Sequence, residues 1–179
     1  VEHGVTALGA VAGSLALLNS DQQTVEVIGA VGYAEDVLEG FRRFPATAPL
    51  PLAEAVRTGE PIWLGSLQEL AARYPHLEAV ATAPGHGAWA AIPVTTDHRV
   101  LGGIGLDFLE PRRFGREDRE WMLALARLCG QALERARLFE AEQRARAQME
   151  AVIRQMPSGV IIAEAPSGRL ILCNEQAAR

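Results

Sequence analysis

The feature that most constrains this chain is a stretch from Arg116 to Met156 with no proline and a single glycine, Gly130. Its apolar residues recur every three or four positions, which predicts one amphipathic helix. At 1.5 Å per residue such a helix is about 60 Å long, about twice the width of a small domain. We therefore expect it to connect two modules or to form a seam between two chains.

The composition is typical of a soluble globular protein. Of the 179 residues, 49% are hydrophobic and 22% are charged, which suffices for one core and part of a second. Apolar runs reach about ten residues, too short to cross a bilayer, and no basic and apolar leader opens the sequence. We expect no membrane segment and a cytoplasmic location. Because the chain starts at Val1 and stops at Arg179 in mid-pattern, we interpret it as part of a longer protein.

The charge argues against nucleic acid as a partner. The formal net charge is -5, and neither half of the chain has the basic cluster that neutralisation of phosphates requires. All 17 basic residues are arginine, which we interpret as the codon composition of a bacterial genome. Cys129 and Cys173 are far apart and each lies in an apolar pattern, so we expect buried, reduced thiols.

The first 115 residues alternate strand and helix signals. Apolar runs and helical spacing predict strands over 11–18, 24–31 and 61–64 and helices over 34–44 and 52–57. Ser66 with Glu69 three residues later predicts a capping box at the start of a further helix, which Pro75 ends.

A loop from Pro75 to Gly87 is followed by two strands, 88–95 and 100–109, which a tight turn through His98 joins. Three glycines in the second strand predict a bulge or the close approach of another element; they are Gly102, Gly103 and Gly105. We expect an α+β fold. An antiparallel sheet of five or six strands would have helices on one face, and the short helices and the loop on the other.

Four segments in this order resemble the GAF domain family. They are PLAEAVRTGEPIW at 51–63, AAIPV at 90–94, GGIGL at 102–106, and Phe114 with Asp118 at a helix start. The resemblance covers residues 4–138, with most of the usual first helix missing upstream of Val5. It implies a six-stranded antiparallel sheet and a sensory module for a small molecule or a protein, commonly dimeric and placed before a signalling output.

The end of the chain resembles the start of a second family, the PAS domain. The matching segments are MPSGVIIA at 156–163, GRLILCN at 168–174 and the alanines at 177–178, preceded by a lead-in helix. The resemblance implies an N-terminal hairpin, and because the ligand-binding half would follow Arg179, no PAS cofactor is assigned. The expected domains are a GAF core over 1–115, a helical linker over 116–156 and a PAS fragment over 157–179.

A small-molecule pocket is the main prediction for a site. Residues from segments that should converge under the 75–87 loop predict an apolar cleft with a few polar groups. The candidates are Trp63, Tyr74, His76, His86, Trp89, Ile92 and Val94. An ordinary core is an equally good interpretation of the same pattern. Either loop histidine could also ligate haem iron or a metal, although both lack the spacing and the companions of metal ligands.

Known ligand and catalytic motifs are incomplete in this sequence. GAF domains that bind cyclic nucleotides have Asn-Lys and later Phe-x-x-x-Asp-Glu; Phe114 and Asp118 match, but Arg119 replaces the Glu and lysine is absent. No cysteine lies where a bilin would be attached. A nucleophile elbow, a phosphate-binding Gly-Lys loop and a carboxylate pair are also lacking. We therefore expect no metal, no required cofactor and no enzymatic activity in this segment.

The long helix carries the candidate dimer interface. Residues at seam spacing are Met122, Leu125, Cys129, Ala132, Ala136 and Phe139. We expect a parallel homodimer along them. The predicted function is the sensory module of a bacterial signalling protein, with a histidine kinase as the first choice. The module would bind a small ligand and signal through the paired helix to the PAS and output domains. A dimerisation spacer without ligand and a haem or redox sensor remain alternatives.

Overall fold

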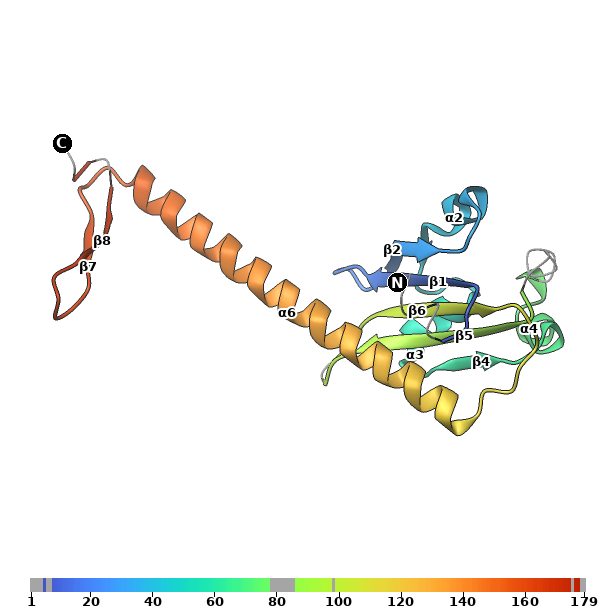
Figure 1. The fold of residues 1–179 in the computed structure, drawn as a ribbon. Helices are drawn as coiled ribbons and strands as arrows, with labels where there is room; N and C mark the ends of the chain where they lie inside the picture. The colour runs from blue at the N-terminus through green and yellow to red at the C-terminus, as the bar shows by residue number, and fades with distance from the viewer. Residues whose placement is uncertain (1–4, 6–7, 78–85, 98, 175, 178–179) are drawn as a thin grey trace. The chain divides into compact units, whose positions relative to one another are not determined.

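The computed structural model describes residues 5, 8–77, 86–97, 99–174 and 176–177. The chain forms two compact units, Val1–Ala132 and Leu133–Arg179. The first unit is built on a six-stranded antiparallel sheet in the order β3-β2-β1-β6-β5-β4 (Figure 1). Its strands are β1 (Ala12–Leu18), β2 (Thr24–Val31), β3 (Arg43–Pro45), β4 (Ile62–Leu64), β5 (Ala88–Thr95) and β6 (Val100–Phe108). The predicted α+β fold with an antiparallel sheet is confirmed.

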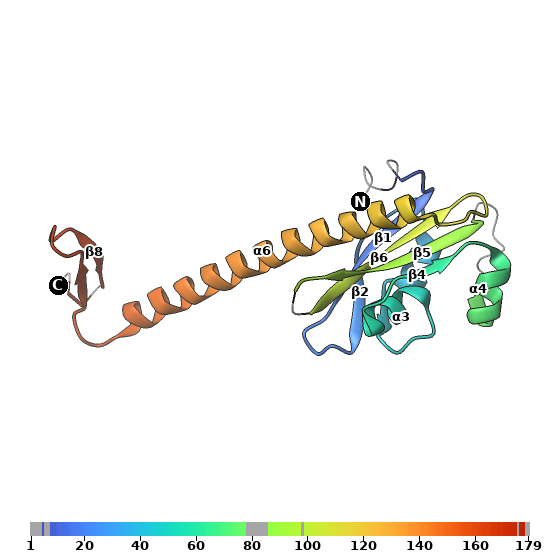
Figure 2. The same cartoon turned by 90° about the horizontal axis from the view of Figure 1, so that it is seen from below.

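Helices cover both faces of this sheet. One face carries α2 (Glu35–Phe41), α3 (Pro51–Thr58), α4 (Leu67–Arg73) and the 3-10 turn η1 (Pro75–Leu77). The other face carries the first part of α6 (Arg116–Gln155), as Figure 2 shows from below. Gly130 of α6 lies so close to the end of β5 that a Cβ there would strike the carbonyl of Thr95.

The centre of the sheet is crowded, which explains two of the glycines in β6. A Cβ on Gly102 would strike the carbonyl of Ala16 on β1. A Cβ on Gly103, which faces the other way, would meet the side chains of Leu52 and Val56 on α3. The predicted close approach of other elements to this strand is therefore confirmed.

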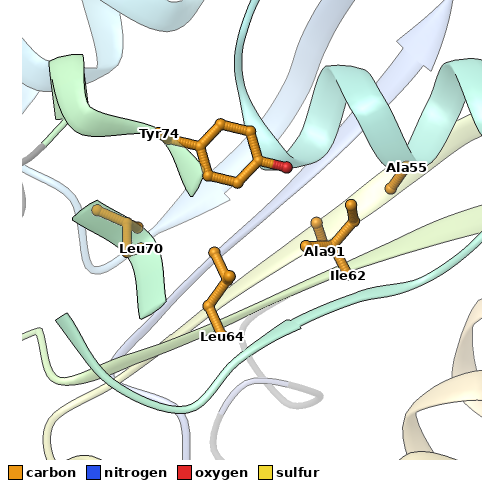
Figure 3. Close-up of a cluster of buried hydrophobic side chains, with 6 residues drawn as sticks. All are labelled: Ala55, Ile62, Leu64, Leu70, Tyr74 and Ala91. Atoms are coloured by element: carbon orange, nitrogen blue, oxygen red, sulfur yellow. The ribbon is translucent and has the colours of Figure 1, made fainter. Parts of the chain in front are cut away.

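Two apolar clusters lie between the sheet and α3. The first joins α3 and α4 to the β4 edge, and its buried members are Ala55, Ile62, Leu64, Leu70, Tyr74 and Ala91 (Figure 3). The second joins α3 to β1, β2 and β3, and its buried members are Ala16, Val25, Phe44, Ala46, Ala53 and Val56. Full burial of each larger side chain contributes about 1.5–3 kcal/mol, so α3 is the main anchor of this face.

The helix predicted over 34–44 is shorter than expected. It ends as α2 at Phe41, and the residues after it form the edge strand β3. Phe44 pairs with Val25 of β2 and is buried in the second cluster. Arg43 forms a 2.8 Å ion pair with Glu26. Cross-strand burial of Phe44 therefore outweighs the local helical spacing.

The predicted cap of α4 is confirmed, with one difference in its partner. The Ser66 hydroxyl accepts a 3.3 Å hydrogen bond from the amide of Glu69. The Glu69 carboxylate accepts a 2.7 Å bond from the amide of Gly65, one residue before the cap. Two amides at the start of the helix are thus satisfied by side chains.

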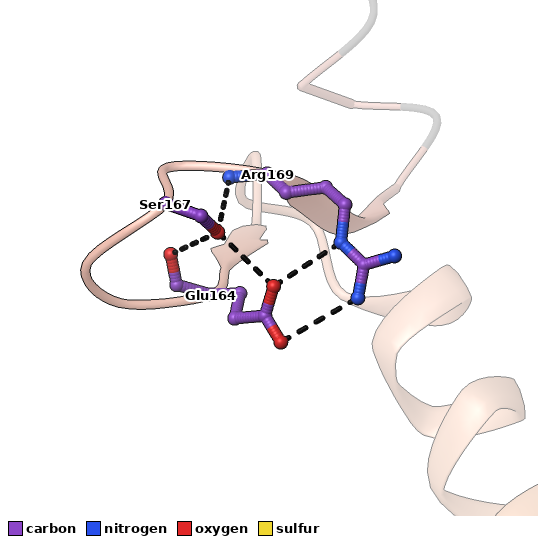
Figure 4. A network of polar contacts seen from close by, with 3 residues as sticks. All are labelled: Glu164, Ser167 and Arg169. Atoms are coloured by element: carbon purple, nitrogen blue, oxygen red, sulfur yellow. Dashed lines mark hydrogen bonds and ion pairs between the residues drawn. The ribbon is translucent and has the colours of Figure 1, made fainter.

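The second unit contains the end of α6 and a hairpin of β7 (Ile161–Ala163) and β8 (Leu170–Cys173). Figure 4 shows the polar contacts at the hairpin loop. Nε of Arg169 lies 3.2 Å from a carboxylate oxygen of Glu164, and the Ser167 hydroxyl donates a 3.0 Å bond to the same oxygen. These contacts are exposed and hold the two ends of the loop together.

Among the residues that the structure describes, no helix combines the length and the apolar character needed to cross a membrane. Most of the expected loop before β5 and the expected turn residue His98 lie outside the described residues.

Candidate ligand-binding site

A cavity of about 440 Å³ lies between the sheet and the short helices of the first unit. Strands β1, β2, β5 and β6 contribute to it, and α2 and α3 line it from the other side. Its apolar lining includes Val37, Leu38, Phe41, Leu52, Leu77 and Trp89. Small-molecule sites in proteins have volumes of roughly 300–1,000 Å³ and mainly apolar walls. This cavity has both properties.

The polar groups of the cavity gather around one carboxylate, Asp107. Its Oδ1 accepts a 3.1 Å hydrogen bond from the hydroxyl of Tyr33. Its Oδ2 lies 3.0 Å from Nδ1 of His86. The rings of Tyr33 and His86 are parallel within 6°, with centroids 6.5 Å apart. Ser14 of β1 also lines the cavity. The site thus has an apolar body and one polar end.

Backbone geometry brings these three side chains together from distant parts of the chain. Asp107 lies on β6, where it pairs with Trp89 of β5. Gly32 has a left-handed φ of 81°, which turns the chain from β2 towards Tyr33. The amide of Gly87 donates a 2.7 Å bond to the carbonyl of Phe108, which fixes His86 beside β6.

The carboxylate sets the protonation of its neighbours. The neighbouring Asp107 carboxylate raises the pKa of His86 above its ordinary value of 6.5, although burial acts in the opposite direction. Burial, and then the Asp107 charge, raise the pKa of Tyr33 well above 10.0. The Tyr33 hydroxyl is therefore a neutral donor to Asp107 at physiological pH.

One polar atom in this group is not satisfied. Nδ1 of His86 is buried and, despite its short distance to Asp107, has no hydrogen bond of acceptable geometry. The Asp107 side chain itself is only 14% exposed. The polar end is therefore largely screened from solvent and leaves hydrogen-bonding capacity unused.

Of the predicted pocket residues, the structure brings His86 and Trp89 to the cavity. Tyr74 lies in the neighbouring apolar cluster, where its hydroxyl donates a 2.6 Å bond to Glu54. His76 is an exposed residue of η1. Among the described residues, no three His, Cys, Asp or Glu side chains are grouped to hold a metal ion.

The other three predicted residues lie on the opposite face of the sheet, under α6. Val94 would touch a Cβ placed on Gly130, and Ile92 shares its face because side chains alternate along a strand. Trp63 packs against Phe114, with ring centroids 5.3 Å apart. The guanidinium of Arg119 on α6 covers the Trp63 ring at 5.4 Å. These residues hold α6 on the sheet.

Sequence reasoning missed Tyr33, Asp107 and Ser14. Asp107 left a signal, because it is the one charged residue in the otherwise apolar strand β6. A carboxylate in a buried strand needs partners, and the structure supplies Tyr33 and His86. Tyr33 and Ser14 left no comparable signal.

The candidate dimer residues on α6 divide between two faces of the helix. Met122 is 1% exposed and packs within its own unit. Leu125 and Cys129 are half-buried, whereas Ala132, Ala136 and Phe139 are exposed. Two large residues that were not predicted are also exposed, Trp121 at 67% and Leu128 at 63%. We call Trp121, Leu125, Leu128 and Ala132 the outer stripe.

The first unit combines an antiparallel sheet with a ligand-sized cavity on one face and the start of a long helix on the other. Residues 1–134 match the family described as GAF domain. The chain therefore belongs to the GAF domain family and contains a sensory or regulatory GAF module. GAF domains are in general regulatory rather than catalytic. A comparison with curated protein sequences gives no match.

Solved structures of bacterial GAF domains are similar to this chain. The GAF domain of a phosphoenolpyruvate-protein phosphotransferase from Coxiella burnetii is 22% identical over 79% of this chain and 82% of its own, with a TM-score of 0.66. A domain of a protein named as a two-component sensor histidine kinase from Sinorhizobium meliloti is 20% identical over 79% and 94%, with a TM-score of 0.59. The second GAF domain of DevS from Mycobacterium smegmatis is 18% identical over 80% and 92%, with a TM-score of 0.58. At these identities the similarity shows the fold.

Proposed function

We propose that this GAF module binds a small molecule in the cavity and signals its occupancy through α6 to a downstream output domain. The observation that carries the proposal is the cavity itself, which is mainly apolar and has one polar end at Asp107. A purely structural gap between helices and sheet would not need a buried carboxylate with two donors beside it.

Strand β5 supports a route from the cavity to α6. Trp89 and Ala91 of this strand line the cavity. Thr95, at the end of the same strand, touches α6 at Gly130. A ligand that favours one position of β5 would therefore also favour one position of α6. The size of this effect is limited by the difference in ligand affinity between the two positions.

The proposed output domain belongs to a bacterial signalling protein that acts as a homodimer. The outer stripe exposes Trp121 and Leu128, and pairing with a second copy of α6 would cover both side chains. The hairpin after α6 would begin a PAS domain, and a histidine kinase is the first candidate for the output, in a cytoplasmic protein. A domain of similar fold from a protein named as a sensor histidine kinase supports this choice.

A cavity-filling variant tests the ligand-binding proposal. Val37 lines the cavity from α2, whereas Glu39 is exposed on the same helix. We expect metabolite mixtures to raise the melting temperature of the wild-type protein and of Glu39→Trp, but not that of Val37→Trp. If no mixture changes the melting temperature of the wild type, or if Val37→Trp responds equally, ligand binding in the cavity is refuted.

A dimerisation module without a ligand is the second candidate, favoured by the exposed outer stripe. It predicts self-association that does not depend on any small molecule and a cavity that stays empty in all mixtures. Analytical ultracentrifugation with and without the metabolite mixtures separates the two candidates. The first candidate requires a ligand-dependent change in α6, which site-directed spin labels on the exposed residues Ala136 and Gln143 would report.

A further inference from the structure

We propose that the cavity selects a largely apolar molecule whose one polar end donates hydrogen bonds, as an amine or a hydroxyl does, and that it rejects carboxylates and phosphates. This inference rests on the proposed ligand-binding function and specifies the chemistry of the ligand. It follows from the charges that line the cavity, from the hydrogen bonds that the Asp107 carboxylate can still accept, and from the apolar character of the remaining lining.

The charge of the cavity excludes anions. None of its described lining residues is arginine or lysine, and its one carboxylate is Asp107. A carboxylate or phosphate placed here would lose its hydration beside another negative charge, with no guanidinium or ammonium group to pair with it. His86 is already beside Asp107.

The hydrogen-bonding capacity of Asp107 favours a donor. Oδ1 is occupied by the Tyr33 hydroxyl. Among the described residues, Oδ2 has only the poorly aligned contact with His86, and a carboxylate oxygen can accept two hydrogen bonds. A ligand that donates to Oδ2 would form a charge-assisted hydrogen bond, the stronger kind.

The unsatisfied Nδ1 of His86 points to the same chemistry. A hydroxyl can donate to Oδ2 of Asp107 and accept from a protonated Nδ1. An ammonium group can donate to both atoms when Nδ1 is unprotonated. Either end group would satisfy Nδ1, the buried atom without a hydrogen bond of acceptable geometry. A carboxylate could accept from Nδ1 but would face Oδ2 as a like charge.

The rest of the cavity requires an apolar body on the ligand. Val37, Phe41 and Leu52 line it, and their side chains have no polar atom. A second polar group on the ligand would lose its hydration without gaining a partner there. The expected ligand is therefore amphipathic, with its polar group at one end.

Three probes that differ only in the end group test this inference. 2-Phenylethylamine, 2-phenylethanol and phenylacetate share a phenyl body without a second polar group and end in an amine, a hydroxyl and a carboxylate. Dissociation constants are measured by titration calorimetry with the full chain. We expect the amine and the alcohol to bind, and the carboxylate to bind at least about tenfold more weakly. Equal or tighter binding of the carboxylate would overturn the inference.

Two variants show whether Asp107 is the cause. Asp107→Asn removes the charge, and we expect the amine-to-carboxylate ratio of affinities to fall to about threefold or less. Glu39→Gln removes an exposed carboxylate outside the cavity lining, so we expect it to retain the wild-type preference. If a folded Asp107→Asn protein keeps the wild-type ratio of affinities, the assignment of the preference to Asp107 is contradicted. If this variant does not fold, the ratio measured with the wild-type protein still tests the inference.

The two proposals fail in different ways. If none of the three probes binds, or if the cavity-dependent metabolite is an anion, the donor-ended ligand is refuted. A melting-temperature response that Val37→Trp abolishes would still support the ligand-binding function in that case. If no metabolite produces such a response, the ligand-binding function itself is refuted.

Discussion

The side-chain amide of Asn174 donates a 3.1 Å hydrogen bond to the carbonyl of Ile153, in the last turn of α6. The same amide donates a 2.9 Å bond to Ser158. Its oxygen accepts bonds from the amides of Val160 and Ala177. Asn174 is only 2% exposed, so one buried side chain joins the end of the helix to the hairpin that follows. This arrangement lies entirely within the second unit.

Asn174→Asp is expected to release the hairpin from the helix end. The new carboxylate has the same shape but cannot donate, and it would face the two carbonyls of Ile153 and Ser158. The loss of buried hydrogen bonds costs about 1–3 kcal/mol per unsatisfied group. Hydrogen exchange at the Val160 amide should therefore become roughly tenfold faster or more. Ser167→Ala, in the exposed hairpin loop, is the control, and equal exchange in both variants would contradict the prediction.

Tyr74→Phe is expected to lower the free energy of unfolding of the domain, and to do so mainly at neutral pH. The hydrogen bond from the Tyr74 hydroxyl, followed by that from Arg73, lowers the pKa of Glu54 below 4.5. A lowered carboxyl pKa stabilises the fold above 4.5, and this contribution is lost as the pH falls through the folded-state value. We expect a loss of about 1–2 kcal/mol at neutral pH that shrinks under acidic conditions.

Urea unfolding across that acidic range provides the measurement for Tyr74→Phe. Glu60→Gln, at an exposed position next to α3, is the control and should leave the pH dependence unchanged. A Tyr74→Phe penalty that is constant with pH would mean that the hydroxyl does not act through Glu54.

The His86 and Asp107 pair is expected to make stability depend on pH near neutrality. The neighbouring Asp107 carboxylate raises the pKa of His86 above 6.5. The stabilisation by the protonated imidazole is complete below 6.5 and is lost as the pH rises through the higher folded-state pKa. We expect the free energy of unfolding of the wild type to fall over this window and Asp107→Asn to flatten the fall. NMR titration of the imidazole should give a lower pKa for His86 in that variant.

Charges in the outer stripe are expected to abolish self-association without unfolding the domain. Trp121 and Leu128 are exposed in the single chain, so Trp121→Glu with Leu128→Glu should change the free energy of unfolding little. Sedimentation should then show a monomer. Met122→Ala is the opposite case, because Met122 is buried. The Met122→Ala substitution should lower the free energy of unfolding by about 2–5 kcal/mol, while the folded fraction still associates. A dimeric double variant would contradict the assignment of the interface.

Most of the fold could be predicted because its signals are local. The capping box at Ser66, the alternation along β2 and the apolar run of β5 depend on residues that are neighbours in sequence. The end of α2 could not be predicted in this way. Phe41 and Phe44 have helical spacing, and only the distant partner Val25 makes Phe44 part of a strand.

The site was harder to predict because a strand has two faces. Trp89 and Ile92 both lie on β5, and their spacing shows that they face opposite ways. Which face has a cavity depends on α2 and α6, whose positions no local pattern gives. The same holds for α6, where Trp121 and Met122 are adjacent in sequence. The sheet decides that Met122 turns inwards and Trp121 turns outwards.

The contact of Gly130 with Thr95 limits how α6 can move on the sheet. Any side chain brought to this place by rotation of the helix would collide with the carbonyl of Thr95. Rolling about the helix axis is therefore opposed at this point. The absence of a side chain at Gly130 thus determines which side of α6 faces Thr95.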